Sequence, residues 1–132
     1  MPYTTITDES SLQFKLQYFY AYTGNYGIRM INDRYCIALG TAFGIEIGTY
    51  VDLILENGEV IKCILSDIKA DEHTEDNNIV TTLNGCATEF IIDEWALNYD
   101  AKITGDISKC KKEWVEKVIK ILIYKKNIFK EG

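Results

Sequence analysis

Apolar and polar residues alternate most regularly near the start of the chain, in the segment 12–22, which reads LQFKLQYFYAY. Apolar or aromatic side chains occupy every even position from 12 to 22, and the polar residues at 13, 15 and 17 occupy odd ones. A period of two over this length predicts a strand with one buried face. The segment 23–27, TGNYG, has turn composition and is expected to end that strand.

The clearest short-range signal is a hairpin centred on Asn57-Gly58, because apolar runs precede and follow this pair. A two-residue Asn-Gly loop supplies the positive φ angles of a type I′ turn, so Leu55 is expected opposite Val60 and Ile54 opposite Ile61. Apolar residues fall on both faces of the two runs. The hairpin is therefore expected to be covered, at least in part, on both sides.

Further short apolar runs follow at 27–31, 35–39, 79–83 and 88–93, separated by turns that contain glycine or asparagine. The polar stretch KADEHTEDNN predicts a surface loop, and Asp106 is placed to cap a short helix. The run VEKVIKILIY fits a helix or a strand, and its β-branched residues favour the strand. About seven strands and little helix predict an all-β fold, a small six-to-seven-stranded barrel with one short helix, since closure removes exposed edges.

Composition places the 132 residues in a single domain, 1–132, with 47% hydrophobic and 26% charged residues. The net charge of −6 argues against nucleic acid as a partner, since phosphates attract basic surfaces. No run approaches the ~20 apolar residues of a membrane span. The first residues, MPYTTITDESS, lack the features of a signal peptide. We expect synthesis in the cytoplasm without export, unless the protein leaves by lysis or within a larger particle.

Metal and cofactor sites are not predicted. The four cysteines are widely spaced without a CxxC pair, which argues against zinc, and Cys36 and Cys63 lie in apolar runs where a reduced, buried thiol is expected. The acidic loop around Asp71 lacks the ligand spacing and central glycine of a calcium loop.

Between Tyr35 and Asp93, the order IALG, IGTYVDLILENGEVIKCILSD and EFIID resembles the double-psi β-barrel superfamily. This group includes the rare-lipoprotein-A-like and barwin-like domains, the expansins and the three-aspartate (3D) domain of lytic transglycosylases. Its members carry a similar order of Gly-Thr, strand, Asn-Gly, strand and Asp, followed by a strand that closes on Ile-Asp or Val-Asp. The resemblance implies a double-psi-like barrel over residues 31–126. Residues 1–30 lie outside the resemblance and are expected to form an N-terminal strand extension.

The resemblance also implies cleavage of glycosidic bonds in peptidoglycan or another polysaccharide. Asp93 in EFIID matches by position the acid/base aspartate of the lytic members, and Asp67 in ILSD matches another aspartate of the same groove. A carboxyl group between apolar walls is suited to protonate a leaving glycosidic oxygen, and a hydrolase would need the second carboxylate as well. The chain departs from the pattern near Ala38, where the first aspartate of the family is missing, and at Ile68-Lys69, which replaces Thr-Gly.

Substrate contacts are expected from Trp95, as a platform for a sugar ring, and from Tyr26 with the neighbouring tyrosines. His73 and Asp71, in the polar loop, are further candidates for contacting substrate, and His73 is also placed to support Asp67 or Asp71. Each residue also has a structural interpretation: aspartate commonly caps turns at strand ends, the tyrosine stripe fits a strand's core face, and the loop residues fit a solvated surface.

Three functions remain open at this stage. The first is a glycan-cleaving enzyme; without a signal peptide, it fits a bacteriophage or mobile-element lysis or tail-associated apparatus with other tail proteins as partners. The second is a noncatalytic glycan-binding or structural barrel of a phage tail or baseplate. The third is an intracellular binding domain unrelated to sugars.

Overall fold

The structure is a computed structural model in which residues 2–40, 44–69, 89–97 and 118–130 are described. Its strands form one mixed sheet in the order β1-β2-β3-β5-β4-β7, and β6 pairs with β3 outside this path. The strands are β1 (Tyr22–Thr23), β2 (Arg29–Ile31), β3 (Arg34–Gly40), β4 (Thr49–Leu55), β5 (Val60–Lys69), β6 (Glu89–Phe90) and β7 (Val118–Asn127). The helical segments are α1 (Leu12–Lys15), the π-helical η2 (Leu16–Tyr20), and the 3-10 turns η1 (Tyr3–Thr5), η3 (Asn25–Gly27) and η8 (Ile128–Lys130).

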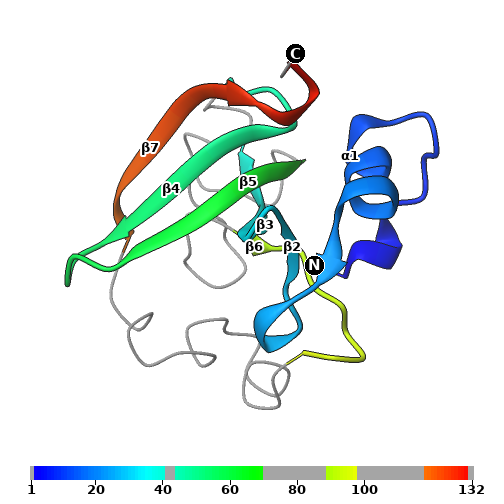
Figure 1. Cartoon of the computed structure of the whole chain (residues 1–132), viewed down its shortest axis with the longest axis horizontal. Coiled ribbons are helices and arrows are strands. Elements are labelled where there is room, and N and C mark those ends of the chain that lie inside the picture. The colour runs from blue at the N-terminus through cyan, green and yellow to red at the C-terminus, as the bar shows by residue number, and fades with distance from the viewer. Residues whose placement is uncertain (1, 41–43, 70–88, 98–117, 131–132) are drawn as a thin grey trace.

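The all-β class with a single short α-helix is confirmed, but the described strands form an open sheet and not a closed barrel. β7 stands at one end of the strand order and β1 at the other, and β1 contributes only two residues to pairing. Figure 1 shows β7, β4 and β5 side by side, with α1 on the other side of the molecule. The predicted strand 79–83 and the helix at Asp106 lie outside the described residues.

The strand predicted over 12–22 is wrong, because residues 12–20 are helical. The Ser11 side chain caps this segment by accepting a hydrogen bond from the Phe14 backbone N–H at 3.1 Å. One helical turn on, the rings of Phe14 and Tyr18 stack with centroids 4.2 Å apart. Leu16 is completely buried, whereas Phe19 is 74% exposed. The Ser11 cap and the Phe14–Tyr18 pair both favour a helix here. The alternation of apolar and polar residues does not match which of these side chains are buried.

Arg29 fastens the N-terminal segment to the sheet. Its guanidinium is buried and donates to the Gln17 side-chain and backbone oxygens, at 3.1 and 2.7 Å, and to the Ala21 carbonyl at 3.2 Å. It also donates to the Thr23 hydroxyl at 3.0 Å and lies 4.1 Å from the centroid of the Tyr3 ring. These contacts replace the water that the positively charged Arg29 guanidinium loses on burial. The described part of the predicted strand extension 1–30 thus contains a helical segment, 12–20, as well as the short strand β1 and the start of β2.

A type I′ turn occurs at Asn32-Asp33 and not at Asn57-Gly58. Asn32 and Asp33 have φ of 50° and 62°, and Ile31 pairs with Arg34 across this two-residue loop. Both are residue types that tolerate the left-handed region. The tight turn makes β2 and β3 antiparallel neighbours and places Arg34 at the start of β3.

The β4–β5 hairpin exists, but its predicted register is wrong by one residue. The loop has three residues: the Gly58 N–H donates to the Leu55 carbonyl, and the Leu55 N–H donates to the Glu59 carbonyl, both at 2.9 Å. Only Gly58 has a positive φ, 86°, in this loop, which matches a type I turn followed by a glycine bulge. Ile54 therefore lies opposite Val60, and Asp52 opposite Lys62.

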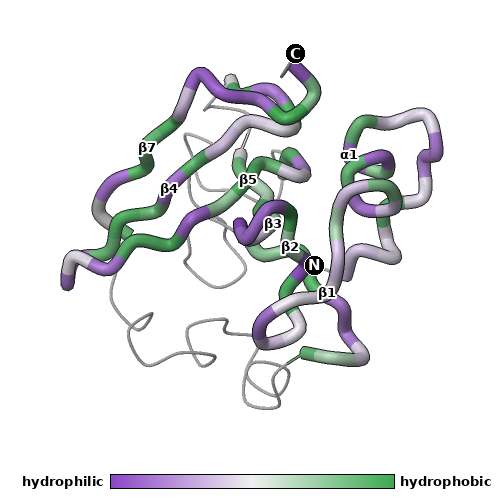
Figure 2. The backbone as a smooth tube through the Cα atoms, viewed as in Figure 1, coloured by the Kyte–Doolittle hydropathy of each residue, from purple (hydrophilic) through white to green (hydrophobic). Residues whose placement is uncertain are grey.

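The corrected register gives the hairpin one apolar face and one mixed face. Val51 and Cys63 are paired and fully buried, and Leu53 and Ile61 are paired and nearly so. The opposite face carries Asp52 and its cross-strand neighbours. In Figure 2, hydrophilic residues gather at the hairpin tip, and hydrophobic and hydrophilic residues alternate along β7. The described part of the chain has no helix long and apolar enough to cross a membrane.

Cys36 and Cys63 are buried free thiols, as expected, and burial raises the pKa of Cys36 to about 11. Both cysteines therefore behave as small core residues. Cys86 and Cys110 lie outside the described residues.

Replacing Gly58 with alanine tests the turn. The added Cβ meets no atom within 4 Å, so any loss of stability comes from the left-handed backbone alone. We expect Gly58→Ala to lower the free energy of unfolding by about 1–2 kcal/mol, measured by urea denaturation. Asn57→Asp, which keeps the acceptor for the Glu59 N–H, should change it little. A Gly58→Ala protein as stable as the wild type would contradict this turn geometry.

Candidate functional site

Asp52 is an acidic residue in the middle of the apolar strand β4, on the mixed face of the hairpin. It is only 6% exposed, and its neighbours across the two adjacent strands are Lys62 on β5 and Leu122 on β7. A carboxylate held this far from water needs partners. Those partners come from β3 and β7.

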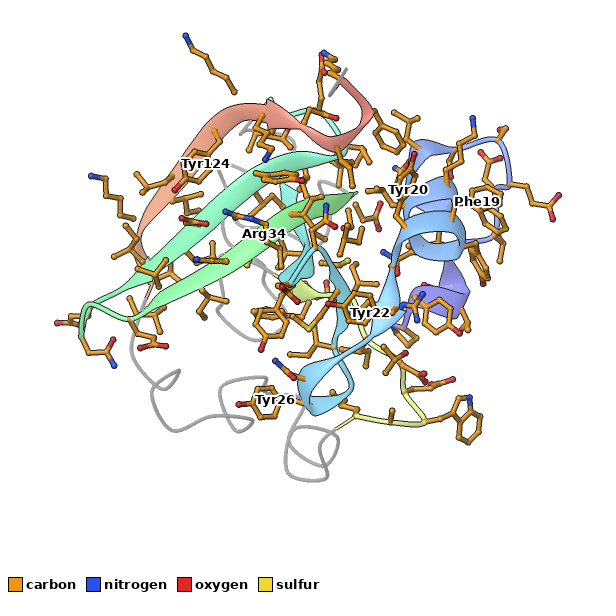
Figure 3. The ribbon with its side chains drawn as sticks, viewed as in Figure 1. Phe19, Tyr20, Tyr22, Tyr26, Arg34 and Tyr124 are labelled. Carbon is orange, nitrogen blue, oxygen red and sulfur yellow. The ribbon has the colours of Figure 1, made fainter. Side chains whose placement is uncertain are left out.

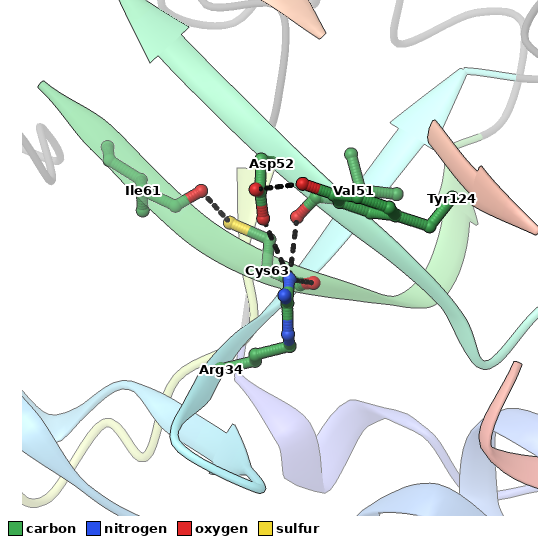
Figure 4. A network of polar contacts seen from close by, with 6 residues as sticks. All are labelled: Arg34, Val51, Asp52, Ile61, Cys63 and Tyr124. Atoms are coloured by element: carbon green, nitrogen blue, oxygen red, sulfur yellow. Dashed lines mark hydrogen bonds and ion pairs between the residues drawn. The ribbon is translucent and has the colours of Figure 1, made fainter. Parts of the chain in front are cut away.

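Arg34 reaches Asp52 from the start of β3. Its Nη1 lies 2.8 Å from Asp52 Oδ1, and the same nitrogen donates to the Cys63 carbonyl at 3.2 Å and, at the limit of hydrogen bonding, to the Val51 carbonyl at 3.5 Å (Figure 4). In Figure 3 the side chain lies over β4 and β5, on the side toward Tyr124. The guanidinium is thus held on the sheet by one carboxylate and two backbone oxygens.

Tyr124, on β7, is hydrogen-bonded to the second carboxylate oxygen of Asp52. Its hydroxyl donates to Oδ2 at 2.6 Å, so both carboxylate oxygens are engaged. This hydrogen bond, with a smaller effect of desolvation, raises the pKa of Tyr124 above its ordinary value of 10.0. Tyr124 as a residue stays 41% exposed.

Two aromatic rings and a second cation, Lys126, lie around this ion pair. The Arg34 guanidinium carbon lies 4.9 Å from the centroid of Tyr50 and 5.7 Å from that of Tyr124. Lys126 Nζ lies 4.8 Å from the Tyr50 centroid, and the Asn32 amide donates to the Tyr50 hydroxyl at 3.3 Å. These five residues line a surface hollow of about 540 Å³, which we call the Arg34 hollow. Cations at such distances from aromatic faces are attracted to them.

The chemistry of the Arg34 hollow suits binding. Its lining combines an accessible ring, Tyr124, with N–H donors on Arg34, Lys126 and Asn32. The adjacent carboxylate, Asp52, is bonded to an arginine and a tyrosine, so it is not presented to a ligand as an acid or base. Among the described residues no cluster of three or more His, Cys, Asp or Glu side chains could hold a metal ion.

Asp93, the predicted acid/base residue, lies at a turn after the segment that pairs with β3. Its Oδ1 accepts the Trp95 backbone N–H at 3.1 Å and its Oδ2 accepts the Thr23 hydroxyl at 2.9 Å. The Ala96 N–H donates to the Asp93 carbonyl, which closes the turn. These are the contacts of a turn-capping aspartate, and through Thr23 the carboxylate is connected to Arg29.

Asp67 lies elsewhere, on β5 beside Ala38 of β3. Its Oδ1 accepts the Ile68 backbone N–H at 2.9 Å and the Gln13 amide at 3.4 Å. Asp67 and Asp93 therefore contact different parts of the N-terminal segment, through Gln13 and Thr23. The described contacts join neither aspartate to the other, and the catalytic role of the pair stays a prediction.

The predicted sugar contacts Trp95 and Tyr26 belong to two turns that pack against each other. A Cβ on Gly27 would come within 2.3 Å of the Ala96 carbonyl oxygen, and the Asp93 N–H donates to the Gly27 carbonyl. Trp95 is 85% exposed, and Tyr26 has a φ of 60°, uncommon for a bulky residue. His73 and Asp71, the other two predicted contacts, lie outside the described residues.

The sequence did carry a signal for the Arg34 hollow that its interpretation missed. An aspartate at the centre of an apolar run, TYVDLIL, is unfavourable in a covered strand unless a cation reaches it. The partners Arg34 and Tyr124 stand 18 and 72 positions away from it in the chain. Only the strand pairing could identify them.

The pH dependence of stability tests the Tyr124–Asp52 hydrogen bond. Because the folded protein raises the pKa of Tyr124, this bond stabilises the fold below pH 10 and its contribution is lost as pH rises through the raised pKa. We expect the wild type to lose more stability than Tyr124→Phe between about pH 9 and pH 11, measured as urea midpoints. Equal losses in the two proteins would show that the hydrogen bond contributes nothing.

Asp93 can be tested for its structural role. We expect Asp93→Ala to lower the free energy of unfolding by about 1–2 kcal/mol, because the turn N–H and the Thr23 hydroxyl lose their acceptor. Asp93→Asn keeps one acceptor oxygen and should lose less. Urea denaturation of the two variants gives the comparison, and an unchanged midpoint for Asp93→Ala would leave the carboxylate without a structural role.

Searches of known protein families, of curated proteins and of solved structures found no match to this chain. The resemblance to the double-psi β-barrel superfamily therefore stays a prediction from sequence motifs.

Proposed function

We propose that this protein is a noncatalytic polysaccharide-binding domain that holds its ligand in the Arg34 hollow. The observation that carries this proposal is the hollow itself, where an accessible tyrosine ring stands beside donors from three strands or turns. Ligand sites in proteins combine apolar surface with a few fixed polar groups in this way.

The arrangement fits sugars in particular. A sugar ring offers C–H groups that pack on an aromatic face and hydroxyl groups that accept hydrogen bonds from arginine, lysine and amide N–H groups. Tyr124 supplies the accessible face, and its hydroxyl is locked by Asp52 so that the ring keeps one orientation. Arg34 is likewise held by Asp52 and by backbone carbonyls. A preorganised site loses little entropy on binding.

Binding is favoured over cleavage because the described aspartates are engaged in structural contacts. Asp52 holds Arg34 and Tyr124, and Asp93 caps a turn. Peptidoglycan is the first ligand to test, because the motif resemblance implies it. A place in a phage tail or baseplate is part of the same proposal, since such a position would bring the domain to the cell wall.

Sedimentation with insoluble peptidoglycan tests the binding role. We expect the wild type to sediment with the polymer, and Tyr124→Ala to bind roughly tenfold more weakly, since aromatic contacts contribute about 0.5–1.5 kcal/mol beyond the area they bury. Tyr124→Phe keeps the ring and should retain most of the affinity. Phe19→Ala removes a ring that is 74% exposed on the far side of the molecule (Figure 3) and serves as the matched control.

Two outcomes would contradict the proposal. Equal binding by Tyr124→Ala and Phe19→Ala would move the site away from the Arg34 hollow. Release of soluble sugar products by the wild type, lost in Asp93→Asn while sedimentation persists, would establish cleavage and restore the catalytic role predicted for Asp93.

A further inference from the structure

The mixed face of strands β5, β4 and β7 is rich in cations. Lys62 lies directly opposite Asp52, and Lys120 lies opposite Ile54, two positions along β4 on the same face. Lys126 and Arg34 reach the same face at the hollow. We call this surface the basic face, formed by Arg34, Lys62, Lys120 and Lys126.

The charge of the basic face is opposite to that of the whole chain. It gathers Arg34 and three lysines around Asp52, whereas the chain carries a net charge of −6. Lys62, Lys120 and Lys126 are exposed to solvent. An acidic protein that gathers lysines on one sheet face produces a local positive potential, which attracts anions to that face and not to the rest of the surface.

The basic face is continuous with the Arg34 hollow. Lys126 lines the hollow, and Lys62 neighbours Asp52 directly across the hairpin. Lys120 lies six residues before Lys126 on β7, which corresponds to about 20 Å of extended strand. A ligand that touched the hollow and all three lysines would therefore be a chain of several units and not a single small molecule.

We infer that the ligand of this domain is an acidic polysaccharide whose carboxylates contact Lys62, Lys120 and Lys126 while one sugar unit occupies the Arg34 hollow. This inference rests on the proposed function and adds the charge of the ligand. Arg34 has a different role from the lysines, because it is mostly shielded from water against Asp52 and a backbone carbonyl, whereas the lysines are exposed. It fixes the hollow, and the lysines supply the attraction for the polymer.

A nucleic acid is the other polyanion that could approach a basic face, and the structure favours it less. Single-stranded nucleic acids bind through bases stacked on open aromatic rings. Here Tyr50 is 6% exposed, with two cations on its ring, so within the described part of the hollow Tyr124 is the accessible platform. The overall negative charge also repels a long phosphate backbone.

Matched polymers test the inference with the 132-residue chain. Polygalacturonate carries a carboxylate on each sugar, and its fully methyl-esterified form has the same backbone without the charges. We expect binding to polygalacturonate by isothermal titration, weakening as salt rises, and binding to the methyl ester at least roughly fivefold weaker. A single-stranded DNA of similar charge is the third probe and is expected to bind more weakly than polygalacturonate.

Charge-neutral variants locate the contact. Lys126→Gln and Lys62→Gln should each weaken polygalacturonate binding by roughly twofold to fivefold. Lys62 is not among the residues that line the hollow, so Lys62→Gln should change binding of the methyl ester little. Lys125→Gln is the matched control, because it removes the same charge from a position between Tyr124 and Lys126 without changing either. An effect of Lys125→Gln equal to that of Lys126→Gln would show attraction to net charge alone and would overturn the inference.

The outcomes separate this inference from the function on which it rests. Equal binding of polygalacturonate and its methyl ester would keep the polysaccharide-binding role and overturn the acidic ligand. No binding to either polymer or to peptidoglycan would overturn both. Binding to DNA alone would overturn both and make the basic face a nucleic-acid site.

Discussion

The parallel pairing of β3 with β5 is the constraint on which the rest of the sheet depends. Two parallel neighbours cannot be joined by a hairpin, so the chain leaves β3, passes through β4 and returns as β5. This path places β4 on the side of β5 that faces away from β3. The other edge of β4 then pairs with β7. The start of β3 then lies beside Cys63, one strand away from Asp52. The Arg34–Asp52 ion pair is a direct consequence of that register.

The ion pair in turn shapes the surface above it. An arginine and an aspartate that are both mostly shielded from water are stable only when each finds hydrogen-bonding partners. Asp52 finds two and the guanidinium finds backbone carbonyls as well, which leaves both side chains rigid. Tyr124 is held by the same carboxylate, so its ring stays accessible in one position. The surface that we propose to bind a ligand is thus a consequence of stabilising a buried charge.

The two aspartates singled out from the sequence have a different place in the fold. Asp67 and Asp93 both accept hydrogen bonds from the N-terminal segment, through Gln13 and Thr23. That segment is helical where a strand was predicted, and it is anchored by the buried Arg29. The alternating pattern was misleading there because aromatic residues of the even-numbered stripe, such as Tyr18 and Tyr20, counted as apolar although they are 47% and 48% exposed.

The sequence by itself determined the all-β class, the existence of the β4–β5 hairpin and the strand at β7, because these depend on local preferences: β-branched runs, an Asn-Gly turn and glycine breaks. It also determined that Cys36 and Cys63 would be buried in apolar runs. The register of the hairpin required the tertiary structure, since an Asn-Gly pair fits a two-residue loop or a three-residue loop with a bulge, and neighbouring strands select between them. The open strand order and the Arg34 hollow likewise required the tertiary structure. Arg34, Asp52 and Tyr124 come from three distant parts of the chain, and no local preference encodes a contact that exists only once parallel and antiparallel strands have paired.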